Sequence, residues 1–261
     1  MTSNSEHSRE WLKAQDVRQI LGVNFYVGDL DATIERISQG GLVVVPAAPA
    51  LKDIAWDSSY RQALIDSDVA ITDSGLMVIL WNLFEHDSIR RVSGLKYLRE
   101  LLRQPEFREP GKTLWVMAGS ASATKNLQWL RTQKIEVPDE CVYEAPIYGE
   151  SVEDTTLVAK LRRLRPKHVV LTIGGGTQER LGYYLKHNLG YLPAIHCIGA
   201  AVAFLSGDQV RIPAWADRIY LGWFFRCAAA PRRYVPRYLS ALRLAPMLWR
   251  YRSRLPVSTE F

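Results

Sequence analysis

The feature that most constrains the fold of this chain is a regular alternation of short β-branched runs with helical periods, from about residue 22 to residue 207. The runs at 42–46 (LVVVP) and 167–173 (KHVVLTI) are typical of strands that are buried on both faces of a sheet. Strands that alternate with helices favour parallel pairing, because each parallel connection needs a long crossover. We therefore predict an α/β fold that is Rossmann-like, with a mainly parallel sheet sandwiched by helices.

The same periods place the individual elements. Strands are expected at 22–27, 42–46, 69–72, 113–118, 167–173 and 194–198, and helices at 30–38, 58–65, 76–83, 94–103, 121–132, 151–163, 176–187 and 199–205. The helix at 151–163 is expected to open with a capping box, in which Ser151 is the N-cap and Asp154 is the acidic partner. No strand pattern follows Gly207. We place a boundary there, between an α/β body (1–207) and a helical, Arg-rich C-terminal appendage (208–261).

This appendage holds most of the positive charge of the chain. Between Arg211 and Arg254 there are ten arginines, no lysine and one acid, whereas the whole chain has a formal net charge of +6, so the body is slightly acidic. Aromatic residues are interleaved with the arginines. Guanidinium groups bind phosphate with two parallel hydrogen bonds, and aromatic rings suit a membrane interface, so the pattern favours a partner that carries both phosphates and lipid. The alternative is a basic pair of helices that is merely solvated.

Composition excludes several other classes of protein. The N-terminus (MTSNSEHSRE) is polar, so no secretory signal is expected, and no apolar run is long enough for a spanning helix. Three cysteines lack CxxC spacing and five histidines lack metal-site spacing, which argues against a disulfide framework, a metal site or a metal cofactor. The chain has the charge to bind nucleic acid, but its basic residues lie on apolar, Trp-rich helices without a reading motif.

Candidate chemistry lies after three of the expected strands, because ligands of parallel sheets bind beyond the carboxyl ends of the strands. The first segment is 71–75 (ITDSG). There Asp73 ends a strand beside a helix start and is a candidate general base, with Ser74 next to it. The alternative is that Asp73 only caps the helix at 76–83.

The second segment is 173–179 (IGGGTQE), directly after the clearest strand. Gly174, Gly175 and Gly176 would let backbone N–H groups approach a diphosphate at a helix N-terminus, and Gln178 and Glu179 would point at the same site. The alternative is a tight turn that binds nothing. A similar turn at 119–122 (GSAS) has the same two interpretations.

The order of these segments resembles the WecG/TagA/CpsF family of bacterial glycosyltransferases, over residues 22–239. The strongest part lies in the tail, where 211–215 (RIPAW), 221–226 (LGWFFR), 231–233 (PRR) and 237–238 (RY) match the family's RAPxW, LEWLYR, PRR and RY blocks. Upstream, 91–94 (RVSG) matches its RVxG block, 174–179 matches its GxPxQE block, and Asp73 falls on its catalytic aspartate. Any one block is unspecific, but so many blocks in the same order are hard to obtain by chance.

The chain also departs from the family pattern. The family's TPN motif falls on Val45, Pro46 and Ala47, so two polar groups are missing. In addition, Ser74 is inserted in the family's DG pair, the proline of the glycine loop is Gly176, and the glutamate of LEW is Gly222. The chain is therefore similar to a divergent branch of the family.

The resemblance implies a metal-independent, inverting sugar transfer in bacterial surface polysaccharide synthesis, without a cofactor. A UDP-sugar, N-acetylmannosamine-like, would donate to a polyprenyl-diphosphate-linked saccharide at the inner face of the cytoplasmic membrane, where the protein would be peripherally bound. Asp73 and Gln178 would be catalytic. The implied substrate-binding residues are Ser74, Arg91, Ser93, Gly174, Gly175, Gly176, Thr177, Glu179, Arg211, Arg226, Arg232, Arg233 and Arg237.

Two other interpretations are weighed against this one. A catalytically impaired homologue, which binds nucleotide sugar or scaffolds a polysaccharide assembly, is suggested by Val45 and Ala47. A nicotinamide-dependent oxidoreductase would need GxGxxG after an early strand and an acid further on, and neither is present. The donor sugar, the acceptor, the pathway and the formation of a homo-oligomer are left open.

Overall fold

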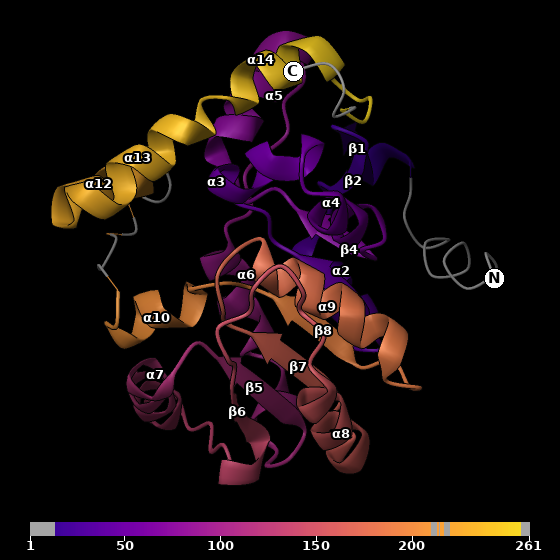
Figure 1. The fold of residues 1–261 in the computed structure, drawn as a ribbon, viewed down its shortest axis with the longest axis vertical. Coiled ribbons are helices and arrows are strands. Elements are labelled where there is room, and N and C mark those ends of the chain that lie inside the picture. Colours follow the sequence, from indigo (N-terminus) through magenta and orange to yellow (C-terminus); the bar gives the residue numbers. More distant parts are fainter. Residues whose placement is uncertain (1–13, 210–212, 214, 217–219, 257–261) are drawn as a thin grey trace.

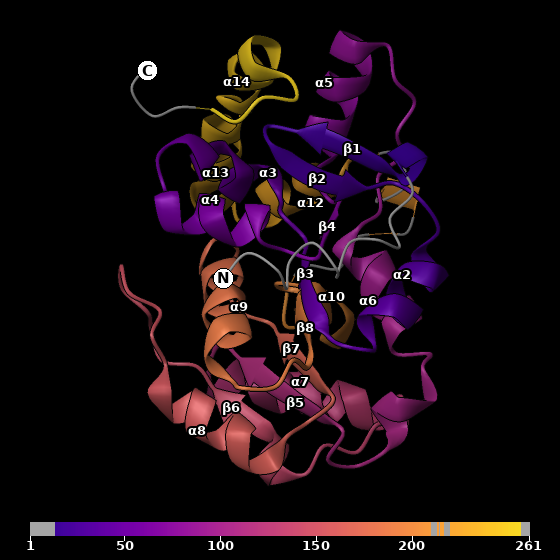
Figure 2. The same ribbon diagram turned by 90° about the vertical axis from the view of Figure 1, so that its right-hand side faces the viewer.

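The computed structural model describes residues 14–209, 213, 215–216 and 220–256, and it contains an eight-stranded sheet between two layers of helices (Figures 1 and 2). The strand order is β1-β2-β4-β3-β8-β7-β5-β6. Only the β1–β2 pair is antiparallel, and every other pair in the sheet is parallel. The expected α/β class with a mainly parallel sheet is thus confirmed.

All six expected strands are present, and two more lie at the edges of the sheet. The strands are β1 (Val17–Ile20), β2 (Val23–Tyr26), β3 (Gly41–Val44), β4 (Val69–Ile71), β5 (Thr113–Met117), β6 (Val142–Glu144), β7 (His168–Leu171) and β8 (Ala194–Cys197). The additional strands are β1 and β6. Each is largely half-buried or exposed, so neither carries the apolar run that identified the central strands.

One face of the sheet is covered by helices of the first layer. These are α3 (Ala48–Leu51), α4 (Ser58–Ile65), α5 (Gly75–Glu85), α8 (Thr155–Leu164) and α9 (Thr177–Asn188). Their apolar residues share one buried cluster with β2, β3 and β7, in which Tyr60, Leu157 and Leu181 are almost fully enclosed. The layer is built around α9, which contacts both β3 and β8.

The opposite face is covered by a second layer with its own buried cluster. It consists of α2 (Leu30–Ile37), α6 (Gly94–Leu101), α7 (Ser120–Thr132) and α10 (Ala201–Ser206). Short 3₁₀ turns connect elements at Ala14–Asp16, Lys52–Ala55, Pro105–Arg108 and Asp139–Cys141. The two layers leave the carboxyl ends of the parallel strands open, and the functional groups described below lie at those ends.

Side-chain caps explain where several helices begin. Asp29, Asp57 and Ser93 accept hydrogen bonds from the first turns of α2, α4 and α6. The expected capping box of α8 is wrong in its register. Asp154 is itself the N-cap, because its carboxylate accepts from the amide of Leu157 at 2.8 Å, and the helix begins four residues after Ser151.

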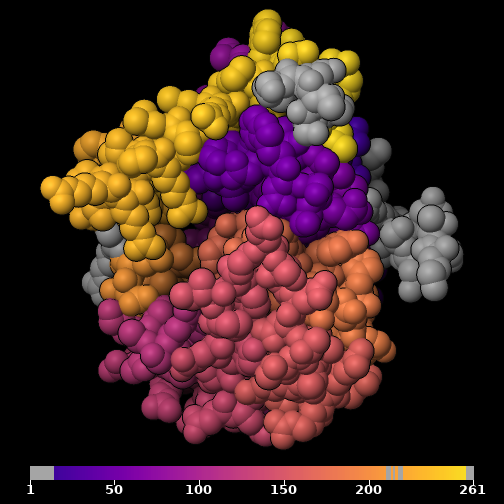
Figure 3. All heavy atoms as spheres, in the orientation of Figure 1, coloured from indigo at the N-terminus to yellow at the C-terminus, as the bar shows by residue number. Residues whose placement is uncertain are grey.

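The described part of the tail includes the helices α12 (Gly222–Ala229), α13 (Pro231–Ala241) and α14 (Leu244–Tyr251). It runs across the upper end of the molecule, over the N-terminal half of the chain (Figures 1 and 3). The last helix packs against α5, with the rings of Phe84 and Trp249 at 5.1 Å, and Leu248 lies in the same cluster as the body. The boundary near residue 207 stays a prediction about folding units.

Backbone hydrogen bonds join the two ends of the described chain. The amides of Leu21 and Gly22, in the β1–β2 turn, donate to the carbonyls of Arg252 and Ser253. Within the described residues, no helix is both long enough and apolar enough to cross a membrane.

Candidate active site

Five parallel strands end at one cavity of about 270 Å³, which we call the polar cavity. Its floor consists of residues that directly follow β3, β4, β5, β7 and β8, namely Val45, Ala47, Asp73, Ala118, Thr172, Ile173, Gly174, Gly175, Ile198, Gly199 and Ala200. The side opposite the floor is lined by residues of α12 and α13, among them three arginines. The tail therefore forms a wall of the site at the sheet edge.

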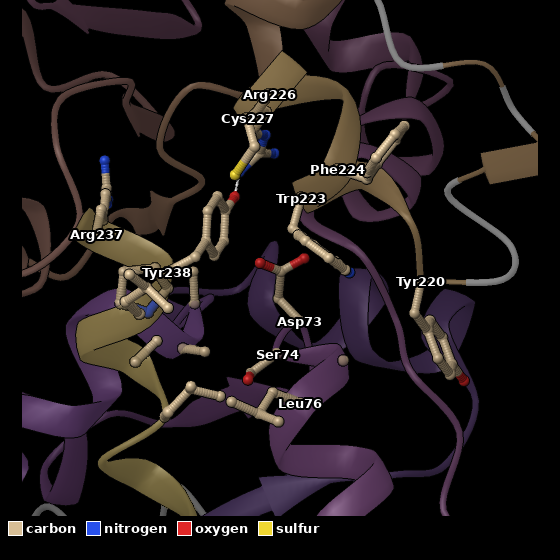
Figure 4. Close-up of a pocket in the computed structure, with 18 of the residues that line it drawn as sticks. Asp73, Ser74, Leu76, Tyr220, Trp223, Phe224, Arg226, Cys227, Arg237 and Tyr238 are labelled. Atoms are coloured by element: carbon tan, nitrogen blue, oxygen red, sulfur yellow. Dashed lines mark hydrogen bonds between the residues drawn. The ribbon is translucent and has the colours of Figure 1, made fainter. Parts of the chain in front are cut away.

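A second, larger cavity of about 720 Å³ adjoins the first one, and we call it the apolar cavity. It lies between α3 and α5 of the body and α12 and α13 of the tail (Figure 4). Its lining is mostly apolar and includes Leu76, Trp223, Phe224, Val235, Leu239 and Leu242. The residues that line both cavities are Ala47, Asp73, Arg91, Arg226 and Arg237. These five residues mark the junction between the cavities.

Asp73 is held at this junction by one oxygen of its carboxylate. Oδ1 accepts from the amide of Gly94 at 3.0 Å and from the guanidinium of Arg91 at 3.2 Å. Arg91 also donates to the backbone carbonyl of Asp73 at 2.6 Å. Among the described residues, Oδ2 has no hydrogen-bond partner, and the carboxylate points into the apolar cavity in Figure 4. One oxygen thus fixes the group, and the other is available to a ligand.

Helix capping, the alternative role for Asp73, belongs to its neighbour. The hydroxyl of Ser74 accepts from the amide of Met77 at 3.1 Å, so Ser74 is the N-cap of α5. Asp73 instead lies at the first turn of α6, whose positive end favours an anionic carboxylate. Ser74 also lines the apolar cavity, and Ser93, the N-cap of α6, lines the polar one.

A chain of buried hydrogen bonds holds α6 against the sheet below Asp73. The hydroxyl of Tyr97 lies 2.7 Å from Nδ1 of His196, His196 lies 3.1 Å from His168, and His168 lies 2.8 Å from Glu106. Burial lowers the pKa of both histidines, so both imidazoles are held in the neutral form. This network fixes the helix whose first amide binds Asp73.

The glycine loop borders the polar cavity with Gly174 and Gly175. Both are exposed, and among the described residues their amide N–H groups donate to no protein acceptor. Neither position needs glycine for packing, because a Cβ on Gly174 would meet nothing within 4 Å and one on Gly175 would meet only Ala50 at 3.7 Å. Gly176 differs, since its φ of +90° requires glycine. Gly176 and Thr177 do not line the cavity.

Gln178 and Glu179 form a buried brace behind this loop. The Gln178 amide donates to Glu179 at 3.0 Å and to the carbonyl of Cys197 at 3.2 Å, and its oxygen accepts from the amide of Gly199 at 2.6 Å. Glu179 accepts from the amide of Gly176 at 2.6 Å. Gln178 lines the polar cavity with its amide already engaged, whereas Glu179 is fully buried and lines neither cavity. The pair ties the loop after β7 to the turn after β8.

Burial also changes the acidity of Glu179. Removal from water raises the pKa of its carboxyl to about 7, although hydrogen bonds from Gln178 and Gly176 and the charge of Arg180 oppose the rise. The carboxyl is therefore poised to change its protonation state near neutral pH, directly under the glycine loop.

The predicted arginines of the tail fall into three groups. Arg226, Arg233 and Arg237 line the polar cavity, whereas Arg232 is exposed and lines neither cavity. Arg211 lies outside the described residues. Arg226 is held most firmly, because it donates to the hydroxyl of Tyr238 at 2.9 Å and stacks over Phe204 at 4.4 Å.

Some lining residues were not predicted as site residues. Tyr238 orients Arg226, and Phe204 supports it from α10. Ala47, which stands where the family has asparagine, lies at the junction beside Asp73. The signal for Tyr238 was present, as it belongs to the RY block, but nothing in the sequence indicated its partner. Within the described residues, no group of three or more His, Cys, Asp or Glu side chains could hold a metal ion.

Two comparisons with known proteins bear on the identity of this chain. A family model described as the glycosyl transferase WecG/TagA/CpsF family matches residues 18–257. The chain is also similar to the N-acetylglucosaminyldiphosphoundecaprenol N-acetyl-beta-D-mannosaminyltransferase of Bacillus subtilis (strain 168). The two are 26% identical over 190 residues, which cover 70% of this chain and 71% of that relative.

Proposed function

This chain belongs to the WecG/TagA/CpsF family of glycosyl transferases, and we propose that it moves an N-acetylmannosamine-like sugar from a UDP-sugar to a polyprenyl-diphosphate-linked saccharide. The single observation that carries the proposal is the arrangement of Asp73. Its carboxylate is fixed through Oδ1 and presents Oδ2 at the junction of a polar and an apolar cavity. A sugar transferase with a lipid-linked acceptor needs a base at such a junction.

The proposed reaction is a single displacement. The acceptor hydroxyl attacks the anomeric carbon of the donor sugar from the face opposite the UDP, the bond between that carbon and the UDP oxygen breaks, and Asp73 Oδ2 takes the hydroxyl proton. One displacement inverts the configuration at the anomeric carbon. Asp73 thus supplies the general base, and UDP leaves with the bonding electron pair.

Positive groups on both sides of the polar cavity would stabilise the departing diphosphate. The N–H groups of Gly174 and Gly175 lie at the N-terminus of α9, and Arg226, Arg233 and Arg237 lie on the opposite wall. Donors that are already in place where negative charge develops lower the barrier without reorganisation. We therefore expect transfer to proceed without an added divalent metal. The brace formed by Gln178 and Glu179 would hold the glycine loop in its binding conformation.

Replacing Asp73 tests the proposal. Asp73→Asn keeps the size of the side chain and an oxygen for Gly94, but it removes the base, which typically costs about 10²- to 10⁴-fold in rate. Transfer would be measured by mass spectrometry of lipid-linked products with a panel of UDP-sugars. Asp29→Asn is the control, because it makes the same change at a helix-capping aspartate that lines neither cavity. Turnover by Asp73→Asn at the wild-type rate would refute the assignment.

The tail would also hold the protein on the inner face of the cytoplasmic membrane. Exposed Trp249 lies on the same helix as exposed Arg250, and exposed Trp223 and Phe224 lie on α12, which packs against the exposed arginines' helix α13. This combination suits an anionic bilayer surface. Neutralising Arg250 and Arg254 should weaken binding to anionic vesicles by about 1 kcal/mol per residue, more clearly at low salt. Unchanged co-sedimentation with vesicles would argue against this orientation.

A second candidate function rests on the wall beside Asp73. Val45 and Ala47 line the polar cavity without a hydrogen-bonding side-chain group, which would suit a homologue that binds nucleotide sugar but does not transfer it. Calorimetric binding of UDP together with no product from any donor would favour this candidate.

A further inference from the structure

The apolar cavity has features that the sugar-transfer chemistry does not require. Its volume of about 720 Å³ is within the range of dedicated ligand sites and exceeds that of the polar cavity. Its outer wall consists of side chains that are themselves exposed, among them Trp223, Phe224, Leu239 and Leu242. Such a concentration of exposed apolar residues around one cavity marks a site for an apolar ligand.

The inner end of the cavity limits which apolar ligand would fit. Asp73, Arg91, Arg226 and Arg237 line this cavity and the polar one. Three guanidinium groups at the end of an apolar cavity complement a ligand whose chain ends in phosphate groups. The neighbouring carboxylate of Asp73 would then lie close to whatever is attached to those phosphates.

We infer that the apolar cavity binds the isoprene units of the acceptor lipid that are nearest to its diphosphate. This assignment rests on the proposed function, because it takes the acceptor to be a prenyl diphosphate. The isoprenoid chain of the lipid enters between the tail helices and α5, and its diphosphate stays at the junction beside Arg226 and Arg237. The saccharide then reaches Asp73 from the apolar side while the donor occupies the polar side.

Cys227 provides a direct measurement of occupancy that needs no sugar transfer. Its thiol lines the apolar cavity, whereas Cys141 and Cys197 are buried, so a small alkylating reagent should modify Cys227 selectively. The probes are geranyl diphosphate, farnesyl diphosphate, inorganic diphosphate and myristate. Because apolar burial strengthens binding with every carbon enclosed, farnesyl diphosphate should protect Cys227 at a concentration at least about tenfold lower than geranyl diphosphate.

The four probes separate the possible ligands. We expect little protection by inorganic diphosphate, and weaker protection by myristate than by farnesyl diphosphate. Equal protection by inorganic diphosphate would show that only phosphate is recognised, and equal protection by myristate would show an acyl-chain site, so either result overturns the proposal. A lack of protection by farnesyl diphosphate overturns it as well.

A matched pair of variants tests the cavity itself. Leu239→Asp places a charge in the cavity wall, whereas Leu83→Asp places one on α5 outside the cavity, and the two leucines are 61% and 64% exposed. Leu239→Asp should abolish the advantage of farnesyl over geranyl diphosphate, and Leu83→Asp should preserve it. If farnesyl diphosphate still protects better than geranyl diphosphate in Leu239→Asp, the isoprenoid chain does not bind in the apolar cavity. If protection follows the expected order but no donor supports transfer, the proposed function fails and the prenyl site stands.

Discussion

The buried carboxyl of Glu179 predicts an unusual dependence of stability on pH. Its pKa is raised from 4.5 to about 7 because the group is fully buried, so the folded state binds the proton more tightly than the unfolded state. The contribution of this group to the free energy of unfolding is therefore fully present below pH 4.5 and is lost as the pH rises to about 7. The rise in pKa corresponds to about 3 kcal/mol of unfolding free energy in total. Most of that loss, about 2 to 3 kcal/mol, falls between pH 5 and pH 8.

Glu179→Gln removes this titration and keeps the shape of the side chain. At pH 5 the variant should have a lower free energy of unfolding than the wild type. At pH 8 the wild type has lost about 2 to 3 kcal/mol of this free energy, so the difference should become smaller by that amount or change sign. Urea denaturation of both proteins at the two pH values measures it. Burial lowers the pKa of His168 and of His196, but both residues are present in both proteins, so their contributions cancel in the difference. A difference between the two proteins that is independent of pH would refute the reasoning.

The same titration should be visible in ligand binding. Both oxygens of Glu179 accept hydrogen bonds, from Gly176 and from Gln178, and protonation leaves one good acceptor fewer. The glycine loop should then be less firmly held below pH 7. Calorimetry with UDP should show tighter binding at pH 8 than at pH 6 in the wild type, and a smaller change in Glu179→Gln.

Three further predictions address the loop, the arginines and the tail. Gly175→Val should weaken UDP binding by about tenfold or more, as expected for a lost hydrogen bond to a charged group, with little loss of stability. Calorimetry measures the affinity for UDP. The control is Gly149→Val, which changes another glycine with open space around it. Arg233→Gln should lower the rate of transfer, whereas Arg232→Gln on the same helix should not, because only Arg233 lines the polar cavity. Similar rates in both variants would contradict the assignment of Arg233 to the site. Leu248→Ala should lower the free energy of unfolding by about 2 to 5 kcal/mol, because the residue is buried against the body. A loss below about 0.5 kcal/mol would show that α14 folds independently.

The central strands were predictable because each is buried on both faces and needs an apolar run. That requirement applies to β3 and β7, and it does not apply to β1 and β6, which lie at the edges of the sheet and are partly exposed. The position of Asp73 at a strand end was likewise readable from local sequence. The sequence could not show whether Asp73 caps the following helix, because Asp73 and Ser74 are both good N-caps and only the fold shows which one is used.

Other features depend on contacts between distant parts of the chain. Gln178 and Glu179 were expected to point at the ligand site. Gln178 does line the polar cavity, whereas Glu179 lines neither cavity, and their bonds to the loop and to the turn at Gly199 were not readable from the sequence. The sequence places Arg232 and Arg233 side by side, but the direction of each side chain depends on how α13 packs. The apolar face of the C-terminal helix α14 packs into a cluster of the body, a contact that its own sequence does not indicate.

The hydrogen bonds between the β1–β2 turn and the end of the tail have a consequence for biosynthesis. Leu21 and Gly22 leave the ribosome long before their partners Arg252 and Ser253. A side chain at Gly22 would collide with Leu255, 2.8 Å from its Cβ, so this junction is closely fitted. Contacts of such wide sequence separation form late. The walls supplied by α12 and α13 also follow the whole sheet in the chain, so a nascent chain that lacks them has no finished site to present to lipid or nucleotide.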